Sequence, residues 1–287
     1  MGKFKVFLKD LRGNKMELRP YLYASTSSRA KAAQMELERR YGNFKPQEAN
    51  VLIALGGDGL MLEALTEGLK HQLPVYGMNR GHVGARLNNY EPDKLEEKIS
   101  NAVAIDVNPL CAVGTYLNGQ VRVHFNAVAW NEVSVMRLGS QAAHLLIKVG
   151  EEKEFLSIGD GHIIATPLGS TSYNESAGGH LLGWRDSLLT STSICSISAA
   201  VRSYFKDREK VHITPLHTVK RPVQIAADNL SYEKVMECGI FKDFSRRVQV
   251  LYDPSQVERL TRRAKIIHFK RPFVRLLNKM QERLRQL

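Results

Sequence analysis

A buried strand that runs into a glycine turn and then a helix constrains this fold more than any other feature. Residues 51–55 (Val-Leu-Ile-Ala-Leu) are continuously apolar, and residues 56–59 (Gly-Gly-Asp-Gly) follow directly. Residues 60–69 come next, with leucines at helical spacing. A short strand that is apolar on both faces is typical of a parallel sheet covered by helices. The sequence therefore predicts an α/β domain with a glycine turn at the end of a strand.

The surrounding segments continue this alternation of strand and helix. Ser27 or Ser28 is predicted to start a helix that Gly42 ends, and residues 74–78 are predicted to form the next strand. Alternation of this kind predicts a parallel sheet with helices on its faces.

The character of the chain changes near Asn108. Beyond it, β-branched and alternating segments are separated by Gly, Asn and Asp turns, which predicts a mainly β domain. A chain of 287 residues has room for two domains. We therefore predict an α/β phosphate-binding domain over residues 1–108, a mainly β domain over 109–255 and a basic amphipathic helical tail over 256–287.

The tail carries most of the positive charge. The net charge is +12, and ten basic against two acidic residues place +8 of it between 256 and 287. The remaining +4 is a weak argument for nucleic-acid binding, so no nucleic-acid partner is expected. The tail is predicted to dock on its own protein or on a second subunit, or else to bind an anionic surface. Its apolar stripe comprises Phe273, Leu277, Met280, Leu284 and Leu287.

Several classes of protein are disfavoured. Three cysteines without a close pair predict neither a disulfide framework nor a CxxC site, and nine histidines show no metal-binding spacing. No apolar run approaches the roughly 18 to 20 residues that span a bilayer, and the first ten residues do not resemble a signal peptide. A cytoplasmic protein with no transmembrane segment and no protein-held metal is expected.

The glycine turn is the sharpest chemical signal. Glycines at 56, 57 and 59 let backbone N–H groups approach a phosphate, and the following helix directs its positive end to the same point. The Asp58 carboxylate could accept a proton from a hydroxyl or hold a divalent cation. The alternative is a tight turn in which Asp58 only caps the helix.

A second glycine loop, residues 77–84 (Gly-Met-Asn-Arg-Gly-His-Val-Gly), follows the next predicted strand. Ligands of open α/β sheets bind at such carboxyl ends, which makes Asn79 a candidate binding residue. The alternative is an ordinary turn in which Asn79 bonds its own backbone.

Two polar segments follow apolar strands in the predicted β domain. Asn131 could bond a base edge and Glu132 could accept both hydroxyls of a ribose, or the pair could be a solvated turn. Residues 160–165 (Asp-Gly-His-Ile-Ile-Ala) then lead into residues 166–179, a loop rich in hydroxyls and small residues with one tyrosine. This loop could be a polar cradle with an aromatic stacking face, or a serine-rich surface loop.

Taken in this order, the four blocks resemble the NAD kinase family. Its sequences carry GGDG, then GxNxGxxGxL, then NE, then DGxxxATPxGSTAYNxSAGG, and here these are residues 56–59, 77–87, 131–132 and 160–179. The first block alone also resembles lipid kinases and phosphofructokinases, whereas the last is long and specific. Residues 220–223 and 251–254 resemble the alphaproteobacterial branch.

The resemblance implies transfer of the ATP γ-phosphoryl group to the 2′-hydroxyl of the adenosine ribose of NAD, with Mg²⁺ or another divalent cation on ATP. It implies that Asp58 is the general base or metal partner, and that Gly56, Gly57 and Gly59 hold phosphates. A homodimer or homotetramer is implied as well, because a neighbouring subunit completes the acceptor site in this family.

The resemblance also assigns the acceptor. Asp160 and Cys195 would hold the nicotinamide half across a subunit contact. The adenosine half would be held by Asn131, Glu132, Thr171, Ser172, Tyr173 and Ser176.

The chain departs from the family pattern at several positions. Ala85-Arg86 replaces the usual Phe-Leu, Glu175 replaces a neutral residue, and Asp228-Asn229 replaces a frequent Asp-Gly. Two alternatives to an NAD kinase are a non-catalytic NAD- or NADP-binding regulator and a lipid kinase that shares only GGDG. The intact Asp58 argues against the regulator. The hydroxyl-rich loop argues against a lipid acceptor, which needs an apolar channel.

Overall fold

The computed structural model divides into two compact units. The first unit contains residues up to 107 together with 246–260, and the second contains 108–245. The residues that the structure describes are 17–82, 84, 86–151, 153–197 and 200–260.

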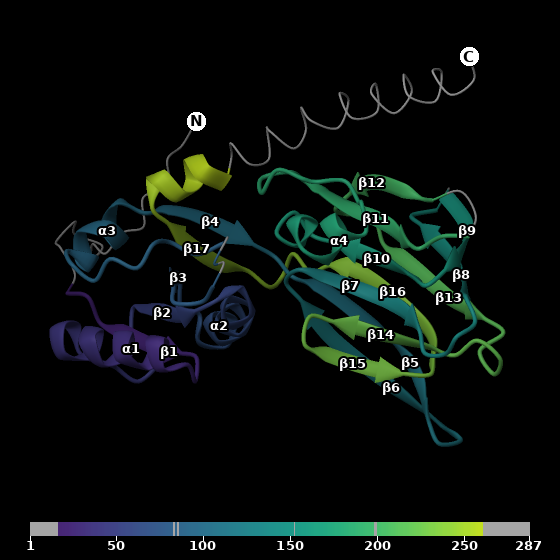
Figure 1. The fold of residues 1–287 in the computed structure, drawn as a ribbon, viewed down its shortest axis with the longest axis horizontal. Helices are drawn as coiled ribbons and strands as arrows, with labels where there is room; N and C mark the ends of the chain where they lie inside the picture. The colour runs from purple at the N-terminus through teal and green to yellow at the C-terminus, as the bar shows by residue number, and fades with distance from the viewer. Residues whose placement is uncertain (1–16, 83, 85, 152, 198–199, 261–287) are drawn as a thin grey trace, which may run out of the picture. The chain divides into compact units, whose positions relative to one another are not determined.

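The first unit is built on a five-stranded sheet in the order β1-β2-β3-β17-β4 (Figure 1). Strands β1 (Pro20–Ala24), β2 (Val51–Gly56) and β3 (Val75–Asn79) are parallel, and β17 (Val248–Tyr252) runs parallel to β3. Strand β4 (Val103–Val107) pairs antiparallel with β17. The predicted α/β domain is confirmed, but its sheet is mixed rather than parallel.

Strand β17 also corrects the predicted extent of the β domain. We assigned residues 109–255 to that domain, yet β17 pairs with β3 and β4 of the first unit. Its mostly apolar sequence gives the pattern of any buried strand, so the pattern could not reveal which sheet it joins.

Helices α1 (Ser28–Tyr41), α2 (Asp58–His71) and α3 (Leu95–Asn101) accompany this sheet (Figure 1). The Ser27 hydroxyl accepts the N–H of Ala30 at the start of α1, and Gly42 ends the helix with a φ of 76°. The predicted limits of this helix are confirmed. Its apolar side chains pack with those of β2, β3 and α3 in one buried core.

The second unit contains two six-stranded sheets. The strand order of one is β12-β11-β10-β7-β14-β15, and the order of the other is β6-β5-β16-β13-β8-β9. The strands of the first of these sheets are β7 (Glu132–Arg137), β10 (Gly161–Ala165), β11 (Leu188–Ile194), β12 (Arg202–Lys206), β14 (Val223–Ala227) and β15 (Leu230–Glu233). Those of the second are β5 (Leu110–Asn118), β6 (Val121–Ala129), β8 (Ala143–Val149), β9 (Lys153–Gly159), β13 (Val211–Leu216) and β16 (Val235–Lys242).

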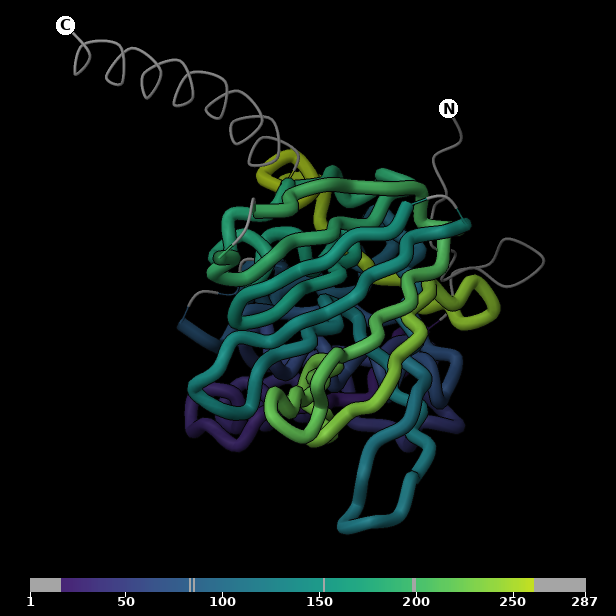
Figure 2. Tube along the Cα trace, turned by 90° about the vertical axis from the view of Figure 1, so that its right-hand side faces the viewer, coloured from purple at the N-terminus to yellow at the C-terminus, as the bar shows by residue number. Residues whose placement is uncertain are grey.

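The two sheets of this unit share one apolar core. Side chains along β8 alternate between buried and half-buried, as expected for a strand with one face against a core. Val135 of β7 and Ile225 of β14 join Ile147 of β8 and Ile213 of β13 in the same buried cluster. Figure 2 shows the strands of this unit side by side, with the β5–β6 hairpin extending beyond its sheet. The predicted mainly β domain is confirmed.

The chain is helical over residues 254–260, and the remainder of the predicted tail lies outside the described residues, including its apolar stripe. Within the described part of the chain, no helix is both long and apolar enough to cross a membrane. The cytoplasmic location stays a prediction.

Candidate functional site

The glycine turn connects the buried strand β2 to helix α2, as the sequence predicted. Gly56 ends the strand, Gly57 occupies the N-cap position, and Asp58 is the first residue of the helix. No described side chain caps this helix end. The backbone N–H groups of the first turn, together with the positive end of the helix dipole, therefore suit an anion such as a phosphate.

The second glycine loop packs directly against this turn. The N–H groups of Arg80 and Gly81 donate to the Gly56 carbonyl at 2.8 and 3.1 Å. A Cβ atom added to Gly81 would lie 2.7 Å from the Gly57 Cα, so the close approach of the two backbones requires glycine at position 81. The two motifs that the sequence marked separately thus form one structure at the carboxyl ends of β2 and β3.

Asn79 shapes this second loop. Its carboxamide oxygen accepts the N–H of Gly81 at 2.9 Å, and Gly84 approaches the same carboxamide with a φ of 59°. This is the turn role that the sequence left open as an alternative, and a binding role for Asn79 stays a prediction.

Asp58 is held in place by the chain that follows the second loop. Its Oδ1 accepts the backbone N–H of Arg86 at 3.1 Å. Arg86 itself is only 8% exposed, so the departure from an apolar residue puts a buried cation in this region. The charges of Asp58 and Arg86 both act on the buried Tyr252. Burial raises its pKa to about 12, while the Arg86 charge opposes the rise and the Asp58 charge adds to it.

The second unit holds the predicted acceptor residues around the junction of β6 and β7. Asn131 lies at this junction and Glu132 begins β7. The Asn131 carboxamide nitrogen donates to the Ser172 hydroxyl at 3.3 Å. Its oxygen, Oδ1, is buried and has no hydrogen-bond partner among the residues that the structure describes. A buried acceptor of this kind is suited to a ligand N–H.

The loop after β10 carries the predicted cradle. It forms a short helical turn, Gly169–Thr171, and then the helix α4 (Tyr173–Ser176). The Tyr173 hydroxyl contacts the Met136 sulfur at 3.3 Å. Burial and then the charges of Cys195, Asp160 and Glu132 raise the Tyr173 pKa. Tyr173 itself is 36% exposed.

Asp160 and Cys195 lie at the opposite ends of neighbouring strands from the cradle loop. Asp160 precedes β10, and its carboxylate pairs with the Arg137 guanidinium at 2.6 Å. Cys195 follows β11, is exposed and has a φ of 44°. The Asp160 N–H donates to the carbonyl of Ile194, which keeps the two positions close together.

Sequence reasoning missed the residues that hold the cradle in shape. The buried Asn174 donates to the carbonyls of Ser170 and His180, and it accepts the hydroxyls of Thr190 and Thr192 at 3.1 and 2.7 Å. The motif contains this asparagine, but only the strand pairing brings the two threonines of β11 beside it. Thr166 and Asp228, which bond the backbone at Asn131, were likewise not predicted as site residues.

Neither unit presents a ready-made metal cage. Across the described ranges, no group of three or more His, Cys, Asp or Glu side chains could hold a metal ion.

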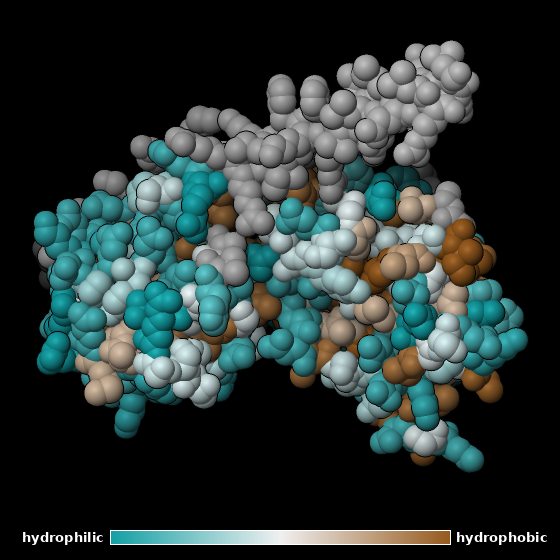
Figure 3. All heavy atoms as spheres, in the orientation of Figure 1, coloured by the Kyte–Doolittle hydropathy of each residue, from teal (hydrophilic) through white to brown (hydrophobic). Residues whose placement is uncertain are grey.

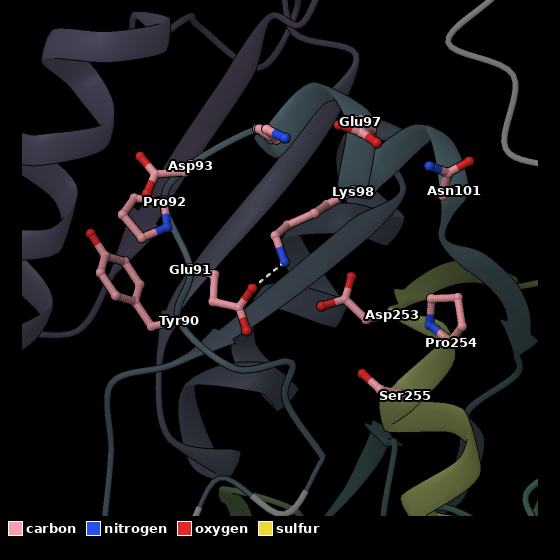
Figure 4. A pocket seen from close by; sticks show the side chains of 11 residues that line it. Tyr90, Glu91, Pro92, Asp93, Glu97, Lys98, Asn101, Asp253, Pro254 and Ser255 are labelled. Atoms are coloured by element: carbon pink, nitrogen blue, oxygen red, sulfur yellow. Dashed lines mark hydrogen bonds and ion pairs between the residues drawn. The ribbon is translucent and has the colours of Figure 1, made fainter.

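A separate hollow of about 740 Å³ lies in the first unit between α3 and the segment after β17 (Figure 4). Lys98 and Glu91 form an ion pair within it, and the Tyr76 hydroxyl donates to Asp253 at 2.8 Å. None of the predicted site residues lines this hollow.

The comparisons with known proteins agree with these features. The model of the ATP-NAD kinase N-terminal domain matches residues 7–107, and that of the ATP-NAD kinase C-terminal domain matches residues 130–234. The chain belongs to the NAD kinase family.

Relatives support this membership over most of their length. The NAD kinase of Caulobacter vibrioides is 37% identical over 78% of this chain and 86% of its own length. The NAD kinase of Xylella fastidiosa strain Temecula1 is 37% identical over 80% of this chain and 89% of its own.

Solved structures of the family share the fold. Yeast NADH kinase complexed with NADH matches with a TM-score of 0.72 at 16% identity, over 84% of this chain and 85% of that one. An Archaeoglobus fulgidus NAD kinase in complex with ATP matches with a TM-score of 0.67 at 19% identity, over 86% of this chain and 99% of that one.

Proposed function

We infer that this chain is an ATP-dependent NAD kinase, which transfers the γ-phosphoryl group of ATP to the 2′-hydroxyl of the adenosine ribose of NAD and so makes NADP. Both domains of the family are matched, and curated NAD kinases align over most of their length. The glycine turn before α2 and the hydroxyl-rich loop after β10 supply the two chemistries that this reaction needs.

The observation that carries the acceptor assignment is the buried Asn131 Oδ1, which has no hydrogen-bond partner in the described part of the chain. Leaving such an acceptor unsatisfied costs about 1–3 kcal/mol. The exocyclic amino group of adenine is an N–H donor that would satisfy it. We assign Glu132 to the ribose hydroxyls and the Tyr173 ring to stacking, with Thr171, Ser172 and Ser176 completing the adenosine half. Asp160 and Cys195 are assigned to the nicotinamide half.

In the reaction, the 2′-hydroxyl oxygen attacks the γ-phosphorus, and Asp58 accepts the proton of that hydroxyl. The bond from that phosphorus to the β–γ bridging oxygen breaks, and ADP leaves. The backbone at Gly56, Gly57 and Gly59 and the N-terminal end of α2 hold the phosphates. Positioning and electrostatic stabilisation of this kind supply most of the catalysis in phosphoryl transfer.

We propose that the divalent cation arrives bound to ATP. When bound, it neutralises charge on the phosphate oxygens. Asp58 is the side chain of this turn with the oxygen ligands that Mg²⁺ prefers. Because it is one carboxylate, it can complete such a coordination shell but cannot make it alone.

We also propose a homodimer or homotetramer. Large apolar side chains are exposed mainly on the second unit, and Figure 3 shows brown areas on the face of that unit in view. Ile197 is 75% exposed and Leu156 is 45% exposed, and they lie on adjacent segments because the Ile197 N–H donates to the Ile158 carbonyl. Light scattering on the purified chain would give the subunit number.

The test is to incubate purified protein with NAD, ATP and Mg²⁺ and to detect NADP with an NADP-specific dehydrogenase. Parallel reactions replace NAD with diacylglycerol or sphingosine and follow phosphate transfer to the lipid. The proposal predicts NADP formation that depends on both substrates, and no lipid phosphorylation. NAD binding without NADP formation would instead indicate the non-catalytic regulator.

A further inference from the structure

We propose that Asp228 is a positioning residue of the acceptor site. Its carboxylate fixes the backbone of Trp130 and Asn131, so that the Asn131 carboxamide presents its oxygen to the amino group of adenine. This inference rests on the proposed NAD kinase function, and it names the group that sets the base specificity of that function.

The contacts of Asp228 hold one edge of this backbone. Its Oδ2 accepts the Trp130 N–H at 2.6 Å, and its Oδ1 accepts the Asn131 N–H at 3.1 Å. One carboxylate therefore takes both N–H groups, and hydrogen bonds to a charged acceptor are stronger than those to a neutral one.

Thr166 holds the opposite edge. Its hydroxyl donates to the Trp130 carbonyl at 2.7 Å, and its backbone N–H donates to the Asn131 carbonyl at 2.9 Å. A Cβ atom added to Gly169 would lie 2.0 Å from the same Asn131 carbonyl oxygen. The backbone at Asn131 is therefore held on both edges and closely packed, with little room to shift.

The backbone conformation of Asp228 is one that glycine adopts more easily, so the turn itself does not explain an aspartate at this position. Asp228 follows β14 in the hairpin to β15, where Ala227 pairs with Leu230, and its φ is 47°. Glycine adopts this left-handed conformation without a steric cost, whereas an L-residue does not. The hydrogen bonds to Trp130 and Asn131 give a physical reason for an aspartate at this strained position.

Fixing the backbone gives the Asn131 side chain a defined direction. Its nitrogen donates to the Ser172 hydroxyl, which leaves the buried oxygen to face a donor from the ligand. A base that carries an oxo group in place of the 6-amino group of adenine would leave both its own oxygen and the Asn131 oxygen without a donor. Buried polar groups discriminate strongly against such analogues. If the backbone were released, the carboxamide could turn away and this discrimination would fall.

The experiment compares NAD with nicotinamide hypoxanthine dinucleotide, in which an oxo group replaces the 6-amino group of adenine. We expect the wild-type chain to prefer NAD by about ten- to hundred-fold in kcat/KM. Two variants test Asp228. Asp228→Asn keeps the shape of the side chain. Asp228→Gly removes the carboxylate but readily adopts the left-handed backbone, so at least one of the two variants should keep the hairpin folded.

Both Asp228 variants should lower the preference for NAD at least about five-fold and raise the KM for NAD, while the KM for ATP stays unchanged. The matched control is Asn229→Gly, the neighbouring residue of the same turn, which should keep the wild-type preference. Thermal melts confirm that each variant is folded.

Asn131→Ala separates this inference from the proposed function. If Asn131→Ala keeps the preference for NAD, the base-recognition role of Asn131 is wrong. If it loses the preference while the folded Asp228 variants keep it, the role of Asp228 is wrong. In the double variant Asn131→Ala/Asp228→Gly, the losses in kcat/KM for NAD should not add, because Asp228 acts through Asn131. Fully additive losses would contradict the proposal.

Discussion

The two units of this protein carry their candidate site residues by different means. In the first unit, the turn before α2 depends on backbone and on missing side chains, with one carboxylate, Asp58, at the start of the helix. In the second, the proposed acceptor residues are side chains on loops and strand ends that a β framework holds from several directions. The first arrangement suits phosphates, which backbone N–H groups bind well, and the second suits a base and a ribose, which need side-chain specificity.

This difference predicts how each unit responds to substitution. Changes at the glycine turn should affect turnover, because we propose that Asp58 acts on the reacting atoms. Changes at the cradle should affect binding of NAD, because its side chains are proposed to recognise parts of the acceptor that do not react.

The largest expected effect is that of Asp58→Asn. The change is nearly isosteric, and loss of general-base catalysis or metal placement should lower kcat by about 10² to 10⁴. NAD affinity should stay within a few-fold of wild type. Steady-state kinetics with calorimetric titration of NAD measures both. Wild-type turnover in this variant would show that Asp58 takes no part in the chemistry. It would also contradict the expectation that changes in the first unit affect turnover.

The next effect is that of Glu132→Ala and Tyr173→Ala. Loss of a charge-assisted contact with the ribose diol should cost about 1.5–3 kcal/mol, or roughly ten- to hundred-fold in NAD affinity. ATP affinity should change little. Titrations of each variant with NAD and, separately, with ATP test this. Equal weakening of both ligands would mean that the cradle does not belong to the acceptor alone.

A smaller effect concerns the framework of the second unit. His162 of β10 is fully buried between the hydroxyls of Ser157 and Ser191, and burial lowers its pKa to about 3. In the unfolded chain the imidazole titrates near its ordinary pKa of about 6.5, so below that pH the unfolded state takes up a proton that the folded state does not. Stability should therefore fall as the pH drops from 6.5 towards 3.

From pH 7 to pH 5 this group should contribute a loss of about 2 kcal/mol in the free energy of unfolding. Urea unfolding at both values measures it, with His162→Gln as the comparison because its side chain does not titrate. The variant should show a smaller difference between the two pH values than the wild type. An identical acid dependence in both proteins would show that His162 is not the group responsible.

The sequence predicted the local parts of this molecule well. The run 51–59 is contiguous, so its strand, turn and helix could be found from spacing alone, and the Ser27 and Gly42 limits of α1 follow from capping chemistry. The parts that were missed depend on contacts between distant segments. Strand β17 inserts beside β3 although more than 160 residues separate them, and Asp228 reaches Asn131 across 97 positions. A single sequence carries no signal for such pairings.

The position of the transferred phosphate tests the proposed reaction. NAD and ATP are converted by the purified chain with Mg²⁺, and the isolated product is analysed by ³¹P NMR. An NAD kinase should give one new phosphomonoester, coupled to the 2′-proton of the adenosine ribose and formed in equal amount to ADP. A phosphate at the 3′ position or on the nicotinamide ribose, or ADP formed without a phosphorylated dinucleotide, would contradict it.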